Sequence, residues 1–246
     1  MLRLNLTKEL HSHLYYLTGK TDQTMTAPAS HIPANDNERI EVLRKYEILD
    51  TPEDGTFDHL TKLAATIFKV PVAIVSLVDT DRIWFKSHYG LSINQIDRDP
   101  GLCASAILSH DTYVVENAAT DPRTLSNPLV AGDFGLRFYA AAPLETEDHY
   151  NLGTFCLLDK HPRTFTAEEK EILTLLARVV MDAMELRLKL RSTMYTVKNL
   201  LSDVSGHLED AAINLRSASN EDQSALISYI DDSQMYLQNL KNQIDF

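Results

Sequence analysis

The residues most able to do chemistry lie together in residues 82–108, which read RIWFKSHYGLSINQIDRDPGLCASAIL. This stretch holds the only tryptophan of the chain and Cys103, one of its two cysteines. A thiol becomes a nucleophile or a covalent anchor when a helix N-terminus, a cation or a nearby base lowers its pKa. The turn before Cys103 predicts the start of a short helix, and Arg98 and His88 are close enough in sequence to approach the thiol.

Three roles are open to Cys103: packing, sensing of a ligand or oxidant, and catalysis or cofactor attachment. The sequence favours packing, because free cysteine is among the most buried residue types. Cys156 alternates with apolar residues in GTFCLLD and is predicted to belong to the core. The two cysteines lie far apart in the chain with no further Cys or His at ligand spacing. The sequence therefore predicts neither a metal site nor a disulfide framework.

Aromatic and aliphatic residues around this stretch predict an apolar pocket. Trp84 and Phe85 are adjacent in a predicted strand and must face opposite sides of a sheet. An apolar cavity is the default site for a small ligand, and a fully packed core without ligand is the open alternative. The pocket candidates are Trp84, Phe85, Cys103, Ile107, Phe134, Leu136 and Phe138.

Length and charge restrict the class of protein. A chain of 246 residues suits one domain of ordinary size plus an appendage. Its formal net charge of −12 opposes nucleic-acid phosphates and anionic lipids, so we expect no nucleic-acid and no membrane partner. No apolar run approaches the roughly 18 residues of a membrane span, and the N-terminus lacks the features of a signal peptide. These observations predict a cytoplasmic location.

The chain divides into three predicted regions. Residues 20–36 contain few apolar groups and two prolines, and residues 1–36 are predicted to be a flexible tail; whether translation starts at Met1 or Met25 stays open. Residues 37–188 carry the alternating patterns of a globular domain, and residues 189–246 are predicted to be a helical hairpin.

The order of elements within residues 37–188 predicts an α+β fold with a mostly antiparallel sheet flanked by helices. Two helical stretches come first, the second with an apolar stripe, and the hairpin PVAIVSLVD and RIWFKSHYG follows. GLCASAILS predicts a short helix and YVVEN a strand, before a last hairpin of FYAAAPLE and NLGTFCLLDK. The stripe of the second helix consists of Phe57, Leu60, Leu63, Ala64 and Phe68.

A long helix follows, and its start is marked by Thr166 and Glu169, which form a capping box. Its first turns are predicted to cover the sheet through Ile172, Leu175, Leu176 and Val179. Apolar residues then alternate in steps of three and four, as in a coiled-coil seam. After a break at SASN a second helix repeats this spacing, so two copies of the hairpin are expected to form a four-helix bundle in a homodimer. The seam consists of Leu190, Met194, Val197, Leu201, Val204, Leu208, Ala211 and Leu215.

The globular part resembles the GAF domains of bacterial sensor kinases and cyclases. The matching phrases are YEILDTPEDGTFDHLTKLAA, PVAIVSLVDTDRIWFKSHYGL, CASAIL, DPRTLSNPLV, LRFYAAAPL and LGTFCLLDKHPRTFTAEEKEIL, in the order of that family. The resemblance implies a sensory domain that binds varied small ligands or none and signals through its terminal helices. Glu116-Asn117 departs from the Asp-Ala usual in these relatives.

Residues 200–244 are similar to the dimerisation and phosphoacceptor helices of sensor histidine kinases. The resemblance implies His207 as a candidate phosphoacceptor and a response regulator or sensor kinase as a partner. In that family the histidine directly follows a serine, whereas here Gly206 separates Ser205 from His207, and the Glu-Leu-Arg-Thr-Pro run is absent. No ATP-binding domain is expected, because the sequence ends at Phe246.

Three ligand-binding or catalytic branches of the GAF family match poorly. Bilin-carrying members attach the chromophore through a Cys followed by His, but Ala104 follows Cys103, so neither a bilin nor another cofactor is predicted. Lys160 and Phe165 match part of the cyclic-nucleotide signature, but Asp159 replaces its Asn. Free-methionine-sulfoxide reductases depend on a cysteine set that two sulfurs on separate elements do not reproduce.

The sequence therefore predicts a non-catalytic GAF-domain signalling protein that senses a small molecule or a partner and transmits through a dimeric helical bundle. The alternative is a phosphorelay component that resembles a histidine kinase, or a docking protein for a response regulator, without an ATP-binding domain. An isolated enzyme is the third hypothesis. The identity of the ligand and the direction of signalling stay open.

Overall fold

The computed structural model describes residues 32–53, 55–217 and 223–244. The predicted N-terminal tail, 1–36, lies largely outside the described residues, and so do residues 218–220 of the predicted break. Among the helices of the described part, none is long and apolar enough to cross a lipid bilayer.

Six strands form one antiparallel sheet in the order β3-β2-β1-β6-β5-β4. The two predicted hairpins are β1–β2 and β5–β6, and the pairing of β1 with β6 joins them. The short edge strand β3 is not predicted, because its sequence Gln-Ile-Asp has a single β-branched residue, whereas the equally short β4 consists of aromatic and β-branched residues. The strands are β1 (Val72–Val78), β2 (Arg82–Tyr89), β3 (Gln95–Asp97), β4 (Tyr113–Val115), β5 (Phe138–Glu145) and β6 (Asn151–Asp159).

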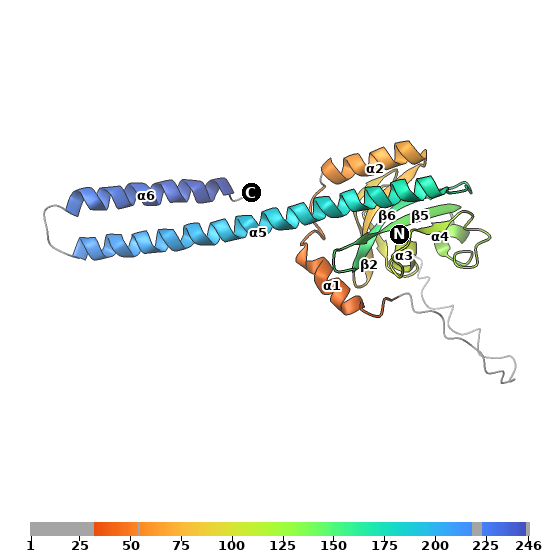
Figure 1. The fold of residues 1–246 in the computed structure, drawn as a ribbon, viewed down its shortest axis with the longest axis horizontal. Helices are drawn as coiled ribbons and strands as arrows, with labels where there is room; N and C mark the ends of the chain where they lie inside the picture. Colours follow the sequence, from red (N-terminus) through yellow and green to blue (C-terminus); the bar gives the residue numbers. More distant parts are fainter. Residues whose placement is uncertain (1–31, 54, 218–222, 245–246) are drawn as a thin grey trace, which may run out of the picture. The chain divides into compact units, whose positions relative to one another are not determined.

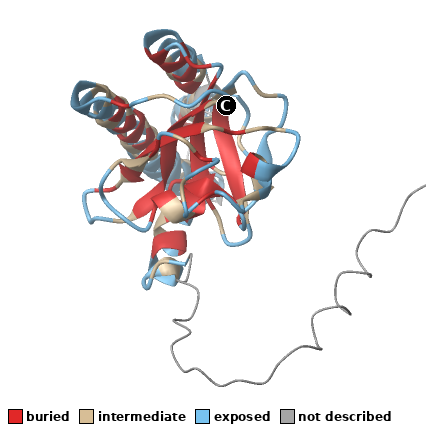
Figure 2. Cartoon of the chain, turned by 90° about the vertical axis from the view of Figure 1, so that its right-hand side faces the viewer, coloured by how far each residue is buried: buried red, intermediate tan, exposed pale blue. Residues whose placement is uncertain are grey.

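Helices cover the two faces of the sheet unequally. One face packs against α2 (Gly55–Phe68) and the first part of α5 (Ala167–Ser217). The other face carries two short helices, α3 (Leu102–Ala106) and α4 (Pro128–Ala131). Figure 2 shows that the buried residues lie in the strands and on the inward sides of the helices. The predicted α+β fold is confirmed.

The apolar stripe of α2 differs from the predicted one. Leu63 is 48% exposed, whereas Thr61 is buried and its Oγ1 lies 2.9 Å from Ser87 Oγ. Phe57, Thr61, Ala64 and Phe68 follow the four–three–four spacing of one helix face. Leu63 lies six residues after Phe57, which is about 240° around the helix, so it points to solvent.

The predicted start of α5 is confirmed. The helix face that packs against the sheet is shifted by about one residue from the predicted face. Thr166 Oγ1 accepts a hydrogen bond from the N–H of Glu169 at 3.1 Å, and Glu169 Oε2 accepts one from the N–H of Thr166 at 2.9 Å. Ile172 and Leu176 pack only at the edge of the core, and the predicted Leu175 and Val179 are 50% and 47% exposed. The residues that α5 buries against the sheet are Leu173, Ala177, Val180, Met181 and Met184.

Beyond the sheet, α5 continues into a hairpin with α6 (Gln223–Ile244), which contacts it along their common length (Figure 1). Arg216 and Asp231 form an ion pair of 2.7 Å between the two helices. Ala212 and Ile230 are buried within the hairpin. The structure describes one copy of the chain, so the four-helix bundle remains a prediction.

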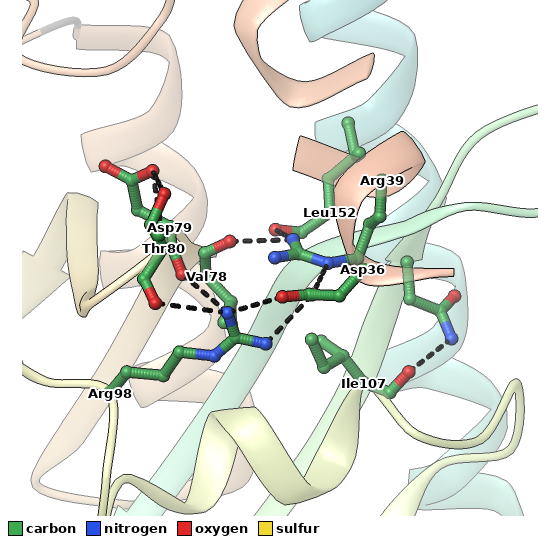
Figure 3. A network of polar contacts seen from close by, with 9 residues as sticks. Asp36, Arg39, Val78, Asp79, Thr80, Arg98, Ile107 and Leu152 are labelled. Atoms are coloured by element: carbon green, nitrogen blue, oxygen red, sulfur yellow. Dashed lines mark hydrogen bonds and ion pairs between the residues drawn. The ribbon is translucent and has the colours of Figure 1, made fainter. Parts of the chain in front are cut away.

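A polar network fixes α1 (Asp36–Lys45) to the ends of the strands (Figure 3). Arg98 donates to both carboxylate oxygens of Asp36, at 2.8 and 2.9 Å, and to the carbonyl oxygens of Asp79 and Thr80. Arg39 is buried and donates to Asp36 and, at 2.7 Å, to the carbonyl oxygen of Val78. Burial alone would raise the pKa of Asp36, but the hydrogen bonds from the two arginines outweigh it and lower that pKa.

Candidate functional site

A small apolar cavity lies on the face of the sheet that carries α3 and α4. Its volume is about 70 Å³, enough for a very small molecule but far below the roughly 300 Å³ at which drug-sized ligand pockets begin. Strand residues form its floor and the short helices with their flanking segments form its walls. The lining residues are Ile74, Phe85, Leu91, Ile93, Ile96, Leu102, Cys103, Leu129, Phe134, Leu136, Tyr139, Cys156 and Leu158.

Four of the predicted pocket residues line this cavity: Phe85, Cys103, Phe134 and Leu136. Ile107 is buried in the same cluster of side chains without lining the cavity.

Trp84 and Phe138 lie on the opposite face, in the core beneath α2 and α5. Trp84 is there because successive strand residues alternate between faces, as expected for a neighbour of Phe85. Phe138 was expected to continue the alternation of Phe134 and Leu136, but Gly135 has a φ of 67° and the strand β5 begins only at Phe138, so one alternation does not extend over all three residues. The cavity-facing residue of β5 is therefore Tyr139, which the sequence did not single out.

Two thiols and a phenol meet at the floor of the cavity. Cys103 Sγ lies 4.0 Å from Cys156 Sγ, and the hydroxyl of Tyr139 donates to Cys103 Sγ at 3.2 Å. All three side chains are at most 5% exposed. The sequence could not predict this contact, because it depends on how α3 packs across β5 and β6.

The same contact couples the protonation of the two thiols. A hydrogen bond from the Cys156 thiol lowers the pKa of Cys103, whereas burial raises the pKa of Cys156 well above its ordinary value. Burial also raises the pKa of Tyr139, so its hydroxyl remains a donor. When one of the two thiols is ionised, the other stays protonated and donates its S–H to the thiolate.

The cation and base proposed to activate Cys103 are engaged elsewhere. Arg98 is held by Asp36 and by backbone carbonyls, and His88 Nε2 lies 3.0 Å from Asn94 Oδ1. Cys103 therefore lacks the exposed, electropositive surroundings of a nucleophilic or chromophore-bearing cysteine. Its position supports packing, and it leaves sensing of a ligand or oxidant open.

A larger, open cleft of about 930 Å³ lies between the end of α2, the start of β1 and the residues after β6. Lys69, Lys160 and His161 line it, and Lys160 Nζ lies 5.5 Å from the centre of the Phe134 ring. Phe165 does not join Lys160 there, because it packs against Phe138 in the core of the opposite face. The two matches to the cyclic-nucleotide signature thus do not converge on one site.

The sequence model of the GAF domain family matches residues 52–184. This chain belongs to the GAF family. The match ends at Met184, so it includes the sheet, the cavity, the cleft and the first turns of α5.

A cyclic di-GMP phosphodiesterase of Pseudomonas aeruginosa is 35% identical over 196 residues, which are 76% of this chain and 33% of that protein. The chain thus spans about a third of the length of this relative. The GAF domain of an Acinetobacter phosphoenolpyruvate-protein phosphotransferase is 17% identical, with a TM-score of 0.47 and coverage of 63% of this chain and 98% of that one. A free methionine-R-sulfoxide reductase of Neisseria meningitidis, solved with its substrate, is 20% identical, with a TM-score of 0.47 and coverage of 65% and 98%.

Outside the GAF domain, the candidate residues lie on the hairpin. His207 is exposed on α5, and so are the seam residues Leu190, Met194, Val197 and Val204. Leu201, Leu208, Ala211 and Leu215 are partly covered. One chain by itself therefore leaves much of the predicted seam in contact with water.

Proposed function

We propose that this protein is a non-catalytic GAF-domain signalling protein, which senses a small molecule or a partner and transmits the change through a dimeric helical bundle. The observation that carries the proposal is the continuity of α5, whose 51 residues belong first to the GAF core and then to the hairpin. A shift of its first turns must displace the hairpin or bend the helix between them, since packed helices adopt discrete arrangements.

The sheet offers a physical link between the cavity and α5. On β5, Tyr139 faces the cavity and Phe138 faces the core beneath α5. On β6, Cys156 faces the cavity, while Phe155 and Leu157 belong to the α5 side. An occupant that displaces these strands therefore also moves the surface on which α5 packs.

Dimerisation is supported by the apolar side chains that the hairpin leaves exposed. They recur at seam spacing along α5, and further ones lie on α6, where Leu226, Tyr229, Met235 and Tyr236 are between 54% and 72% exposed. Contiguous exposed apolar surface marks an interaction site. A second copy presents the same stripe and fits the heptad-like spacing.

Xenon is a suitable probe of transmission, because it enters dry apolar cavities. Under xenon pressure we expect the amide NMR signals of Cys103 and Tyr139 to shift and the amide hydrogen exchange of residues 190–217 to change. Leu129→Phe adds bulk at the partly exposed rim of the cavity and should abolish both responses. A response in the cavity with unchanged exchange in the hairpin would argue against transmission.

A second candidate function, that of a phosphorelay or response-regulator docking component, is favoured by the exposure of His207 on the hairpin. Phosphoramidate, which phosphorylates imidazoles, tests it directly. Preferential acid-labile phosphate on His207 over the exposed His161, measured by mass spectrometry, would support the phosphorelay. Equal labelling of the two histidines would remove the reason to single out His207.

A further inference from the structure

Three potential metal ligands from two separate segments meet at one end of the sheet. His110 lies between α3 and β4, Glu145 ends β5, and His149 belongs to the β5–β6 turn. Glu145 Oε1 lies 3.0 Å from His110 Nδ1 and 2.5 Å from His149 Nδ1. One ligand atom from each residue lies within 4.8 Å of the other two.

The turn that carries two of these ligands has a defined conformation. The N–H of Thr146 donates to the carbonyl oxygen of Tyr150, and the N–H of His149 donates to the carbonyl oxygen of Thr146, both at 3.0 Å. His149 has a φ of 63°, in the left-handed region, which directs its side chain back toward Glu145.

The segment that carries His110 is fixed to the same hairpin. Asn151 is buried and its side-chain amide donates to the carbonyl oxygens of Ile107 and Ser109, each at 3.0 Å. His110 follows directly, so its position relative to Glu145 is set by these backbone contacts. Ligands held by surrounding hydrogen bonds require little rearrangement when an ion binds.

Two imidazoles and one carboxylate are a ligand set that suits Zn²⁺ and leaves a fourth position for water. With bonds of about 2.0–2.2 Å, neighbouring ligand atoms of a tetrahedral zinc lie about 3.3 Å apart. The contact of Glu145 with His110, 3.0 Å, is close to this value, whereas its contact with His149, 2.5 Å, is shorter and must lengthen when an ion binds. The side chains of His110 and His149 are 59% and 80% exposed, so they are free to adjust. Imidazole ligands disfavour Mg²⁺ and Ca²⁺, which prefer oxygen.

The surrounding charges are mixed. Glu147 lies in the same hollow and favours a cation, whereas Arg178 of α5 opposes one. Thr174, Ala177 and Met181 of α5 complete the wall, so an ion at this place would lie beside the helix that leaves the domain.

We propose that His110, Glu145 and His149 form a binding site for a divalent transition metal of the zinc type. The ion replaces the hydrogen bonds between the imidazoles and Glu145, with both Nδ1 atoms unprotonated. It joins the segment after α3 to the β5–β6 turn. The site is distinct from the apolar cavity and does not depend on the proposed signalling function.

Isothermal titration of the full chain with ZnCl₂ tests the site. Glu145→Gln and His149→Ala should each weaken binding at least about tenfold. His161→Ala is the matched control, because His161 Nδ1 lies 3.2 Å from Asp159 but belongs to no three-ligand cluster among the described residues. A second control is the double variant His11→Ala/His13→Ala. It removes two histidines that lie two positions apart in the sequence and could bind a metal ion by themselves. Both controls should bind Zn²⁺ as the wild type does.

Co²⁺ provides a spectroscopic check, since its visible absorption reports a low-coordinate protein site. The absorption should appear in the wild type and in His161→Ala and be absent from Glu145→Gln. Zn²⁺ should also raise Tm in the first two proteins but not in the third. Unchanged affinity in both site variants, or loss of all binding in the His11/His13 variant, would overturn the proposal.

Discussion

In the GAF domain large apolar side chains such as Phe138 and Leu173 have no exposed surface, whereas in the hairpin Leu190, Met194 and Val204 keep 56%, 39% and 47% of theirs. Both regions include part of α5. The apolar face of its first turns is buried against the sheet, whereas the apolar face of its later turns is only partly buried by α6. A domain that buries its own core can fold alone, while a contiguous exposed apolar stripe marks a surface suited to a partner. The exposed side chains of the hairpin support the proposal that a second chain binds there. Leu63, Leu175 and Val179, about half exposed on the outer sides of α2 and α5, form a further apolar surface on the GAF domain.

The largest effect is expected for a charge in the seam. Leu201→Asp places a carboxylate in the apolar layer between two hairpins, which costs at least several kcal/mol per site. Analytical ultracentrifugation should find a dimer for the wild type and a monomer for the variant, with the far-ultraviolet circular dichroism of the GAF domain retained. Asn199→Asp, exposed and outside the seam, should remain dimeric. A wild-type protein that is monomeric at micromolar concentration would refute the prediction that the seam is a dimer interface.

Truncation within the complete core should act on folding instead of association. Phe138→Ala removes a fully buried ring that packs against Phe165, and we expect a loss of about 3–5 kcal/mol in the free energy of unfolding. Leu63→Ala, at an exposed position of α2, should change it by less than about 0.5 kcal/mol. Urea denaturation measures both. A loss in Leu63→Ala as large as that in Phe138→Ala would mean that Leu63 does not lie on the exposed face of α2.

A smaller loss is expected at the cavity. Cys103→Ala should cost about 1–2 kcal/mol, because the side chain is small and already borders empty space. Cys156→Ala should cost a similar amount, and the double variant should cost less than the sum, since the two sulfurs are in contact. Additive losses in a double-mutant cycle would show that the thiols do not interact.

The smallest effect concerns pH. The pKa of Asp36 is lowered in the folded state, so its contribution to stability is complete above its ordinary value of 3.8 and is lost as the pH falls through the lower folded value. Asp36→Asn should therefore lose stability near neutral pH and show a shallower decline in acid than the wild type. The exposed Asp133→Asn is the control. Identical acid profiles of wild type and Asp36→Asn would contradict the role of the network.

Much of the fold was predictable because its signals are local. The two strand hairpins and the capping box of Thr166 and Glu169 depend on residues a few positions apart, and they are confirmed. The errors are rotations by about one position, as for Leu175 and Val179 on α5, which are exposed while Leu173 and Ala177 are buried. A periodic pattern identifies a helix more firmly than the direction of its face.

The site was less predictable because its parts come from distant segments. Phe85, Cys103, Phe134 and Leu136 converge on one cavity, but the contact of Cys103 with Cys156 depends on packing across the sheet. The cluster around Glu145 was missed for the same reason: one of its histidines comes from a different loop, so no ligand spacing marks it in the sequence. Sequence pattern suggests which residues are apolar or reactive, and tertiary packing decides which of them meet.

The central claim, that α5 couples the GAF domain to the hairpin, is tested most directly by changing the length of the helix after Lys189. Two inserted residues rotate the hairpin by about 200° relative to the sheet, whereas four add about one turn and leave the faces within about 40° of their original direction. Amide hydrogen exchange of the hairpin with and without xenon is the measurement. We expect the xenon response to vanish with two inserted residues and to persist with four, with both regions folded. An equal response in the two insertions would show that the GAF domain and the hairpin act independently.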